Sequence, residues 1–95
     1  MNCSTVTFTR HAIERMFFRA IAPQVVVALI ERGEVIASYS DDKPHPSVLL
    51  LGFVEGSPLH VVVARDEGTG DCYVVTVYVP DPTLWSDDFR TRRKS

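Results

Sequence analysis

A short stretch near the start of the chain carries a histidine and two arginines at helical spacing. His11, Arg15 and Arg19 recur one turn apart, so they project from neighbouring turns of an α-helix. Arginine offers a planar fork of donors that suits phosphate oxygens, and histidine can take or give a proton near neutral pH. In RNA cleavage the 2′-hydroxyl must lose a proton and the leaving 5′-oxygen must gain one. These residues therefore indicate phosphate chemistry; the alternative is a solvated helix face on which Glu14 or other acids pair with the arginines.

A second histidine, His60, lies inside the otherwise apolar segment 59–64. At this position a histidine either points into a cleft or is a hydrogen-bonded core residue. Thr76 and Tyr78 share one face of a later strand, because side chains alternate along a strand. Their hydroxyls can hold a substrate phosphate or orient His60, although both are also ordinary strand residues. His45, in a proline-flanked loop, is expected at the surface.

The helix that presents His11 needs an apolar face of its own. Thr9 is well placed to cap its N-terminus through the side-chain hydroxyl. Phe18 falls on the polar side, where an aromatic ring is either part of a binding surface or covered by the C-terminal tail. We expect the opposite stripe to be buried, and its members are Ala12, Ile13, Met16, Phe17 and Ala20.

The remaining elements follow from turn signals and apolar runs. Pro23 and Gly33 frame a second predicted helix over residues 24–32, with Gly33 as its C-terminal cap. Short turn-rich connections join the later strands, which predicts an antiparallel meander. The expected order is β-α-α-β-β-β-β in the α+β class, with strands over 5–8, 34–39, 48–54, 59–65 and 73–79.

Composition is that of one folded domain over residues 1–95, with a core at about 5–85 and a basic tail at 86–95 that we expect to be frayed. The net charge of −2 gives no overall attraction to nucleic acid. Basic residues gather at the two ends of the chain, so a local positive patch forms if the first helix and the tail come together. Trp85 is expected to pack against the sheet.

The two cysteines, Cys3 and Cys72, form neither a disulfide framework nor a Cys-x-x-Cys zinc pair. With no visible secretory signal and no apolar run near 20 residues, we predict a cytoplasmic protein with free thiols and no membrane partner. The phosphate-binding glycine loop, the Gly-x-Ser-x-Gly elbow and the dinucleotide fingerprint are all missing from the sequence. No cofactor or metal site is predicted.

The motif Thr9-x-His11-Ala12-x-x-Arg15-Met16-x-x-Arg19, with Gly33, Leu59-His60-Val61-Val62 and Thr76-x-Tyr78, resembles a family of small bacterial domains of unknown function. That family is similar to the RelE-like and BrnT-like toxins of toxin–antitoxin modules. The resemblance covers roughly residues 6–82. It implies a RelE-like fold, with two helices on a twisted antiparallel sheet, and a small antitoxin-like protein as partner.

The resemblance also implies cleavage of RNA without a metal, leaving a 2′,3′-cyclic phosphate and a 5′-hydroxyl. By this resemblance His11, Arg15, Arg19 and His60 match motif positions for catalysis, and Tyr78 is included as a further catalytic residue. Toxins of this type are usually basic, whereas this chain is slightly acidic.

The leading hypothesis from sequence is a toxin-like endoribonuclease, with His11 or His60 as acid or base and with Arg15 and Arg19 as the phosphate clamp. The rivals are a non-catalytic protein-interaction module, which includes self-association as a homodimer, and a degenerate toxin homologue that has lost activity. The nuclease hypothesis requires the helix residues and a sheet residue such as His60 or Tyr78 to converge in one cleft.

Overall fold

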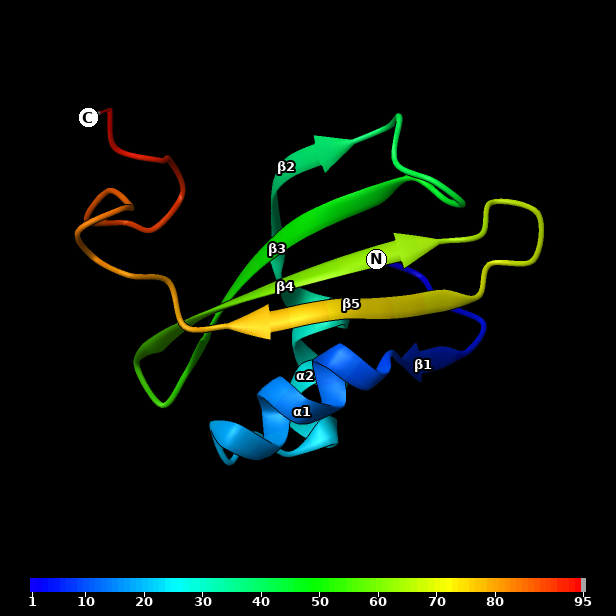
Figure 1. The fold of residues 1–95 in the computed structure, drawn as a ribbon, viewed down its shortest axis with the longest axis horizontal. Coiled ribbons are helices and arrows are strands. Elements are labelled where there is room, and N and C mark those ends of the chain that lie inside the picture. Colours follow the sequence, from blue (N-terminus) through cyan, green and yellow to red (C-terminus); the bar gives the residue numbers. More distant parts are fainter. Residues whose placement is uncertain (95) are drawn as a thin grey trace.

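The computed structural model describes residues 1–94 and shows two helices and a five-stranded sheet (Figure 1). The order of elements is the predicted one, and the α+β class is confirmed. The elements are β1 (Val6–Phe8), α1 (Arg10–Phe18), α2 (Pro23–Arg32), β2 (Glu34–Tyr39), β3 (Ser47–Val54), β4 (Ser57–Arg65) and β5 (Cys72–Tyr78).

The strands lie in the order β1-β5-β4-β3-β2. Strands β2 to β5 form the predicted antiparallel meander, and β1 adds a parallel strand to the outer edge of β5. The prediction of an antiparallel sheet is therefore wrong at β1, and the sheet is mixed, because the short β1 returns from the chain start to pair in parallel with the last strand. Since β1 ends at Phe8, the edge of β5 beyond it is left for α1 to occupy.

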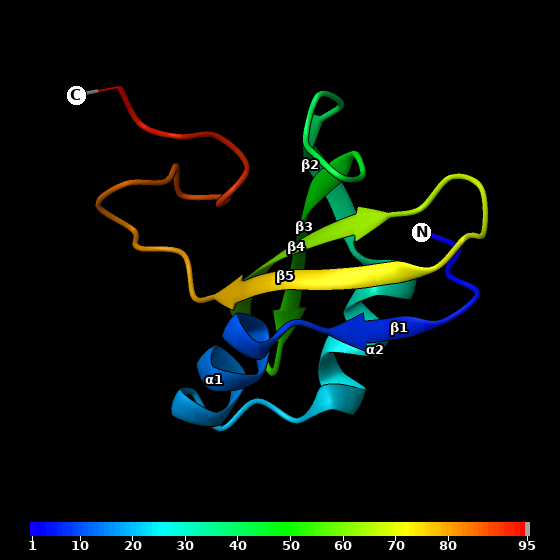
Figure 2. The same cartoon turned by 45° about the vertical axis from the view of Figure 1, so that its right-hand side comes forward.

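The main core lies between the helices and one face of the sheet. Helix α2 packs on β3 and β4, and α1 packs on β5. Figure 2 shows α2 behind the sheet and α1 below its β5 edge. The buried residues shared by these elements are Ala12, Met16, Val26, Leu29, Ile30, Leu50, Leu59, Val61, Val63, Cys72, Val74 and Val77.

The prediction of a fully buried stripe on α1 is wrong in part. Ala12 and Met16 are buried, but Ile13 and Phe17 are 55% and 88% exposed and Ala20 is also exposed. The reason is the place of the helix: α1 contacts the margin of the sheet along β5, so only a narrow line of its surface faces the core.

Gly33 ends α2 as predicted, although for a different physical reason. Its backbone is extended, and its N–H donates to the Leu29 carbonyl at 2.6 Å. A β-carbon at this position would lie 2.5 Å from that same oxygen. Glycine is needed here for close approach to the helix end, and a left-handed conformation is not involved.

Part of the second face of the sheet, around His60, is covered by the chain that follows β5. His60 on β4 pairs in register with Leu51 on β3 and with Tyr78 on β5, and Trp85 packs edge-on against the His60 ring with centroids 4.5 Å apart. Trp85 is 7% exposed, so the prediction that it packs against the sheet is confirmed. Figure 2 shows this C-terminal segment on the opposite side of the sheet from α2.

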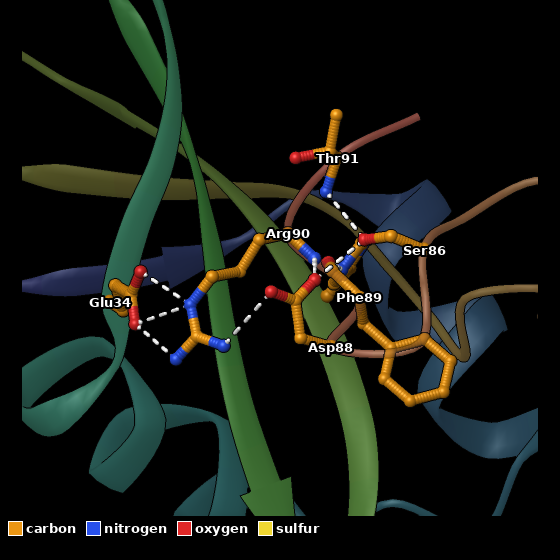
Figure 3. A network of polar contacts seen from close by, with 7 residues as sticks. Glu34, Ser86, Asp88, Phe89, Arg90 and Thr91 are labelled. Carbon is orange, nitrogen blue, oxygen red and sulfur yellow. Dashed lines mark hydrogen bonds and ion pairs between the residues drawn. The ribbon is translucent and has the colours of Figure 1, made fainter. Parts of the chain in front are cut away.

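The prediction of a frayed basic tail is wrong for the described residues. Arg90 makes a two-pronged contact with Glu34 of β2, and its other guanidinium nitrogen lies 3.7 Å from Asp88 (Figure 3). Arg93 pairs with Asp87 at 2.8 Å. These tail arginines are paired with nearby acids, on β2 or within the tail itself, instead of building a patch with α1. Ser95, the end of the predicted tail, lies outside the described residues.

The prediction of free thiols is also wrong. Cys3 and Cys72 form a disulfide across a sequence separation of 69 residues. The parallel pairing of β1 with β5 places Val6 opposite Cys72, and the chain before β1 folds back over the start of β5. This arrangement brings Cys3 beside Cys72. Neither helix of the described chain is long and apolar enough to cross a membrane.

Candidate functional site

His11 and Arg15 lie together in an open hollow on the solvent side of α1. The hollow has a volume of about 320 Å³ and is lined by His11, Glu14, Arg15 and Phe18. The His11 Nε2 atom lies 2.9 Å from the Thr76 hydroxyl of β5. An exposed imidazole is therefore held at a fixed place beside a guanidinium, which is the pairing that the sequence predicted.

The start of α1 is anchored to β5 by the residue that caps it. The Thr9 hydroxyl accepts from the Ala12 N–H at 3.1 Å, as predicted, and donates to the Val75 carbonyl at 3.0 Å. One side chain thus satisfies a free helix N–H and ties the helix to the strand. His11 follows Thr9 by two residues, and Thr76 follows Val75 on β5. The contact between His11 and Thr76 is therefore a second attachment of α1 to β5.

The end of α1 is closed by paired backbone bonds. The Ala20 and Ile21 N–H groups donate to the carbonyls of Phe17 and Met16, which is the Schellman arrangement. Ala20 has a φ of +55°, a left-handed conformation usually taken by glycine. The helix is therefore fixed at both ends, and the side chains between them have a defined orientation.

Arg19 lies in a different hollow from His11 and Arg15. That hollow, of about 470 Å³, lies between the α1–α2 connection and the β3–β4 hairpin, and it also contains Glu55 and Val79. The predicted three-residue face of α1 is consequently divided by the structure. His11 and Arg15 stay together, whereas Arg19, just after the helix end, lies in a hollow lined mostly by apolar side chains.

His60 and Tyr78 form a separate pair beneath the C-terminal segment. His60 is fully buried; its Nδ1 lies 3.1 Å from the Tyr78 hydroxyl and its Nε2 lies 2.9 Å from the Phe89 carbonyl. A carbonyl oxygen can only accept, so Nε2 carries the hydrogen and Nδ1 accepts from Tyr78. Both ring nitrogens are satisfied within the protein.

The surroundings of this pair favour the neutral forms of both groups. Burial lowers the pKa of His60 below its ordinary value, against a smaller opposite effect of the Phe89 carbonyl. Burial likewise raises the pKa of the Tyr78 hydroxyl. The structure thus assigns Tyr78 the role of orienting His60, one of the two uses that the sequence left open. It does not bring His60 or Tyr78 into the hollow of His11, so the convergence that the nuclease hypothesis required is not found for these two residues. The sheet residue that contacts His11 is Thr76.

The exposed surface of α1 contains apolar side chains beside its charged ones. Phe17 and Phe18 are 88% and 78% exposed, and Ile13 is also largely exposed. Phe18 lines the hollow of His11 and is open to solvent, so the alternative that the tail covers it is wrong. The exposure of Phe17 was not predicted. Helical periodicity identifies an apolar face, but it does not show how much of that face the sheet covers.

The comparison with known families covers both helices and the strands β2 to β5. Residues 8–79 match the family described as Domain of unknown function (DUF4258). The chain belongs to the DUF4258 family. No curated protein and no solved structure matches it. All five residues predicted for catalysis lie inside the DUF4258 match, whereas the segment that covers His60 lies beyond its end.

Proposed function

We propose that this DUF4258 protein is a toxin-like endoribonuclease that acts on RNA without a metal and binds it across the solvent face of α1. The observation that supports the proposal is the contact between His11 and Thr76, which holds an exposed imidazole beside Arg15 in an open hollow. The element order is compatible with the RelE-like fold that the resemblance implies. A cytoplasmic location, an antitoxin-like partner and a homodimer remain predictions.

In the proposed reaction His11 is the acid–base group. When Nε2–H donates to the Thr76 hydroxyl, Nδ1 carries a lone pair and can take the proton of the attacking 2′-hydroxyl. The protonated ring can then supply the proton that the 5′-oxygen needs on leaving. Thr76 is a positioning residue, because its contact with Nε2 fixes the plane of the imidazole; its hydroxyl can accept from Nε2–H or donate to Nε2.

The charge that develops on the phosphate is assigned to Arg15. Its guanidinium lies in the same hollow as His11 and can donate to two phosphate oxygens at once. Phe18, at the rim, offers a flat face on which a base can stack. Arg19 contacts the RNA backbone further along the strand in this proposal, and His60 with Tyr78 holds the C-terminal segment in place.

The direct test is cleavage of a single-stranded RNA by purified protein, with analysis of the product ends. We expect 2′,3′-cyclic phosphate and 5′-hydroxyl ends. His11→Ala should lower the rate by roughly 10²–10⁴-fold, and Arg15→Ala by roughly 10²–10³-fold. Arg32→Ala is the matched control, because Arg32 is exposed on α2 and lines neither the hollow of His11 nor that of Arg19. Equal rates for wild type and both hollow variants would refute the proposal.

A second candidate function, a protein-interaction module, is favoured by one observation. Ile13, Phe17 and Phe18 present a largely exposed apolar surface on one short helix, and such surfaces often mark protein contacts. Expression in a bacterial host separates the two functions. Growth inhibition that is relieved by His11→Ala supports the nuclease. Inhibition or partner binding that is lost in Phe17→Asp and kept in His11→Ala supports the interaction module.

A further inference from the structure

A cavity at the opposite end of β5 from the tail has no role in the function proposed above. It has a volume of about 550 Å³, within the usual range for small-ligand sites of about 300–1,000 Å³. It lies between the start of α1, the β2–β3 loop and β5. Its lining residues are Thr9, Asp42, Lys43, Pro44, His45, Ser47, Ala64, Tyr73 and Val75.

Flat aromatic surface is the first property of this cavity. The rings of His45 and Tyr73 are nearly parallel, with an interplanar angle of 8° and centroids 5.7 Å apart. His45 was expected at the surface, but it is half-buried against this tyrosine. Tyr73 comes from a strand and His45 from a loop, so the two planes are set by separate parts of the chain. A planar ligand can extend this stack.

The charges around the cavity select the kind of planar group. Asp42 lines it, and Asp66 lies 4.0 Å from the His45 ring. Ser47, 3% exposed, donates its hydroxyl to Asp42 Oδ2 at 2.5 Å and so fixes that carboxylate. Within residues 1–94, Asp42 Oδ1 has no hydrogen-bond partner. These acids disfavour a phosphate in the cavity and favour a neutral ring that carries N–H donors.

The cavity lies next to the contact that holds His11. Thr9 and Val75 line the cavity, and their neighbours along the two elements, His11 and Thr76, hold the proposed catalytic contact. Thr9 and Val75 are themselves joined through the Thr9 hydroxyl. Thr9 and Arg15 are six residues apart, roughly 9 Å along a helix axis, so a strand whose phosphate lies at Arg15 can place the base of a neighbouring nucleotide in the cavity.

We propose that this cavity is a base-binding subsite for single-stranded RNA. The base stacks on the aromatic pair, and a base with an exocyclic amino group donates to Asp42 Oδ1. Uracil lacks that amino group, so cytosine and adenine are preferred over it. Carboxylates are known to accept a hydrogen bond from the cytosine amino group in base recognition. Lys43, at the rim, contacts the adjoining phosphate. This inference rests on the proposed RNA substrate and names the bases it selects.

The test is the binding of short 2′-O-methyl oligonucleotides of C, A or U, which have no 2′-hydroxyl to attack and so stay intact on the wild-type protein. We expect the C and A oligonucleotides to bind more tightly than U. Tyr73→Leu should weaken binding of the C oligonucleotide by roughly 5- to 150-fold, the range for one lost stacked base. Asp42→Asn keeps an acceptor for Ser47 and should remove the preference for C over U.

Phe53→Leu is the matched control, because Phe53 is 55% exposed on β3 and does not line this cavity. Wild-type affinity in Tyr73→Leu together with an unchanged base preference in Asp42→Asn would overturn the subsite. So would failure of all three oligonucleotides to bind.

Cleavage assays separate this result from the proposed function. His11-dependent cleavage with no effect of Tyr73→Leu on binding leaves the nuclease standing and removes the subsite. Base-selective binding that depends on Tyr73, without any RNA cleavage, supports the subsite and removes the nuclease.

Discussion

Replacing His60 by alanine tests whether this histidine supports the fold or the chemistry. The fully buried ring holds two hydrogen bonds, to Tyr78 and to the Phe89 carbonyl, and an edge contact with Trp85. Each hydrogen bond contributes about 0.5–1.5 kcal/mol, and the aromatic contact about 0.5–1.5 kcal/mol. We therefore expect His60→Ala to lower the free energy of unfolding by roughly 3 kcal/mol, inside the ~2–5 kcal/mol range of large-to-small core substitutions.

Urea unfolding followed by the fluorescence of Trp85, the single tryptophan of the chain, measures this loss where it occurs. His45→Ala is the matched control, since His45 is only half-buried and has an aromatic contact but no hydrogen bond among residues 1–94; it should lose no more than about 0.5–1.5 kcal/mol. A loss of less than about 0.5 kcal/mol in His60→Ala, the size of a surface substitution, would refute the structural role. Lost RNA cleavage at unchanged stability would instead assign His60 to the chemistry.

Three further predictions concern stability. Burial lowers the pKa of His60, so the unfolded chain takes up the proton first as the pH falls. The stability that this histidine contributes is therefore complete above the unfolded pKa of about 6.5 and is lost below it. Between about pH 7.5 and pH 5.5, urea titrations should show a smaller loss of unfolding free energy for His60→Ala than for wild type. The Cys3–Cys72 disulfide closes a loop spanning 69 residues, worth about 4 kcal/mol in the chain-entropy description, so a reductant or Cys3→Ser should lower Tm clearly, and an unchanged Tm would contradict the bond. Ala20→Gly should raise stability by about 1 kcal/mol, because Ala20 is left-handed at the end of α1; equal or lower stability in thermal unfolding would count against that conformation.

Local patterns were enough to predict every helix and strand of the meander. Pro23 and Gly33 enclosed α2, and turn-rich connections separated β3, β4 and β5, so neighbours in sequence became neighbours in the sheet. The pairing of β1 with β5 was not predicted, because three residues carry too little pattern to identify a distant partner. The disulfide was missed for the same reason, since only that pairing brings Cys3 to Cys72.

The candidate site was predictable only in its local part. The spacing of His11 and Arg15 on one helix sufficed to place them together. Whether His60 joined them depended on which sheet face it occupied and on what covered that face, and no local pattern contains that information. Phe17 shows the same limit, because its exposure follows from the position of α1 at the margin of the sheet.

The attachment of α1 to β5 has a consequence for the order in which the protein is built. During synthesis the residues of α1 leave the ribosome long before Val75 and Thr76, which supply the contacts for Thr9 and His11. The strand beside it, β1, also waits for β5. Contacts this distant in sequence form late, because a long loop must close first. The nascent chain therefore carries His11 on a segment that has not docked and is too short to be a stable helix by itself. The proposed site is assembled only after β5 has been made.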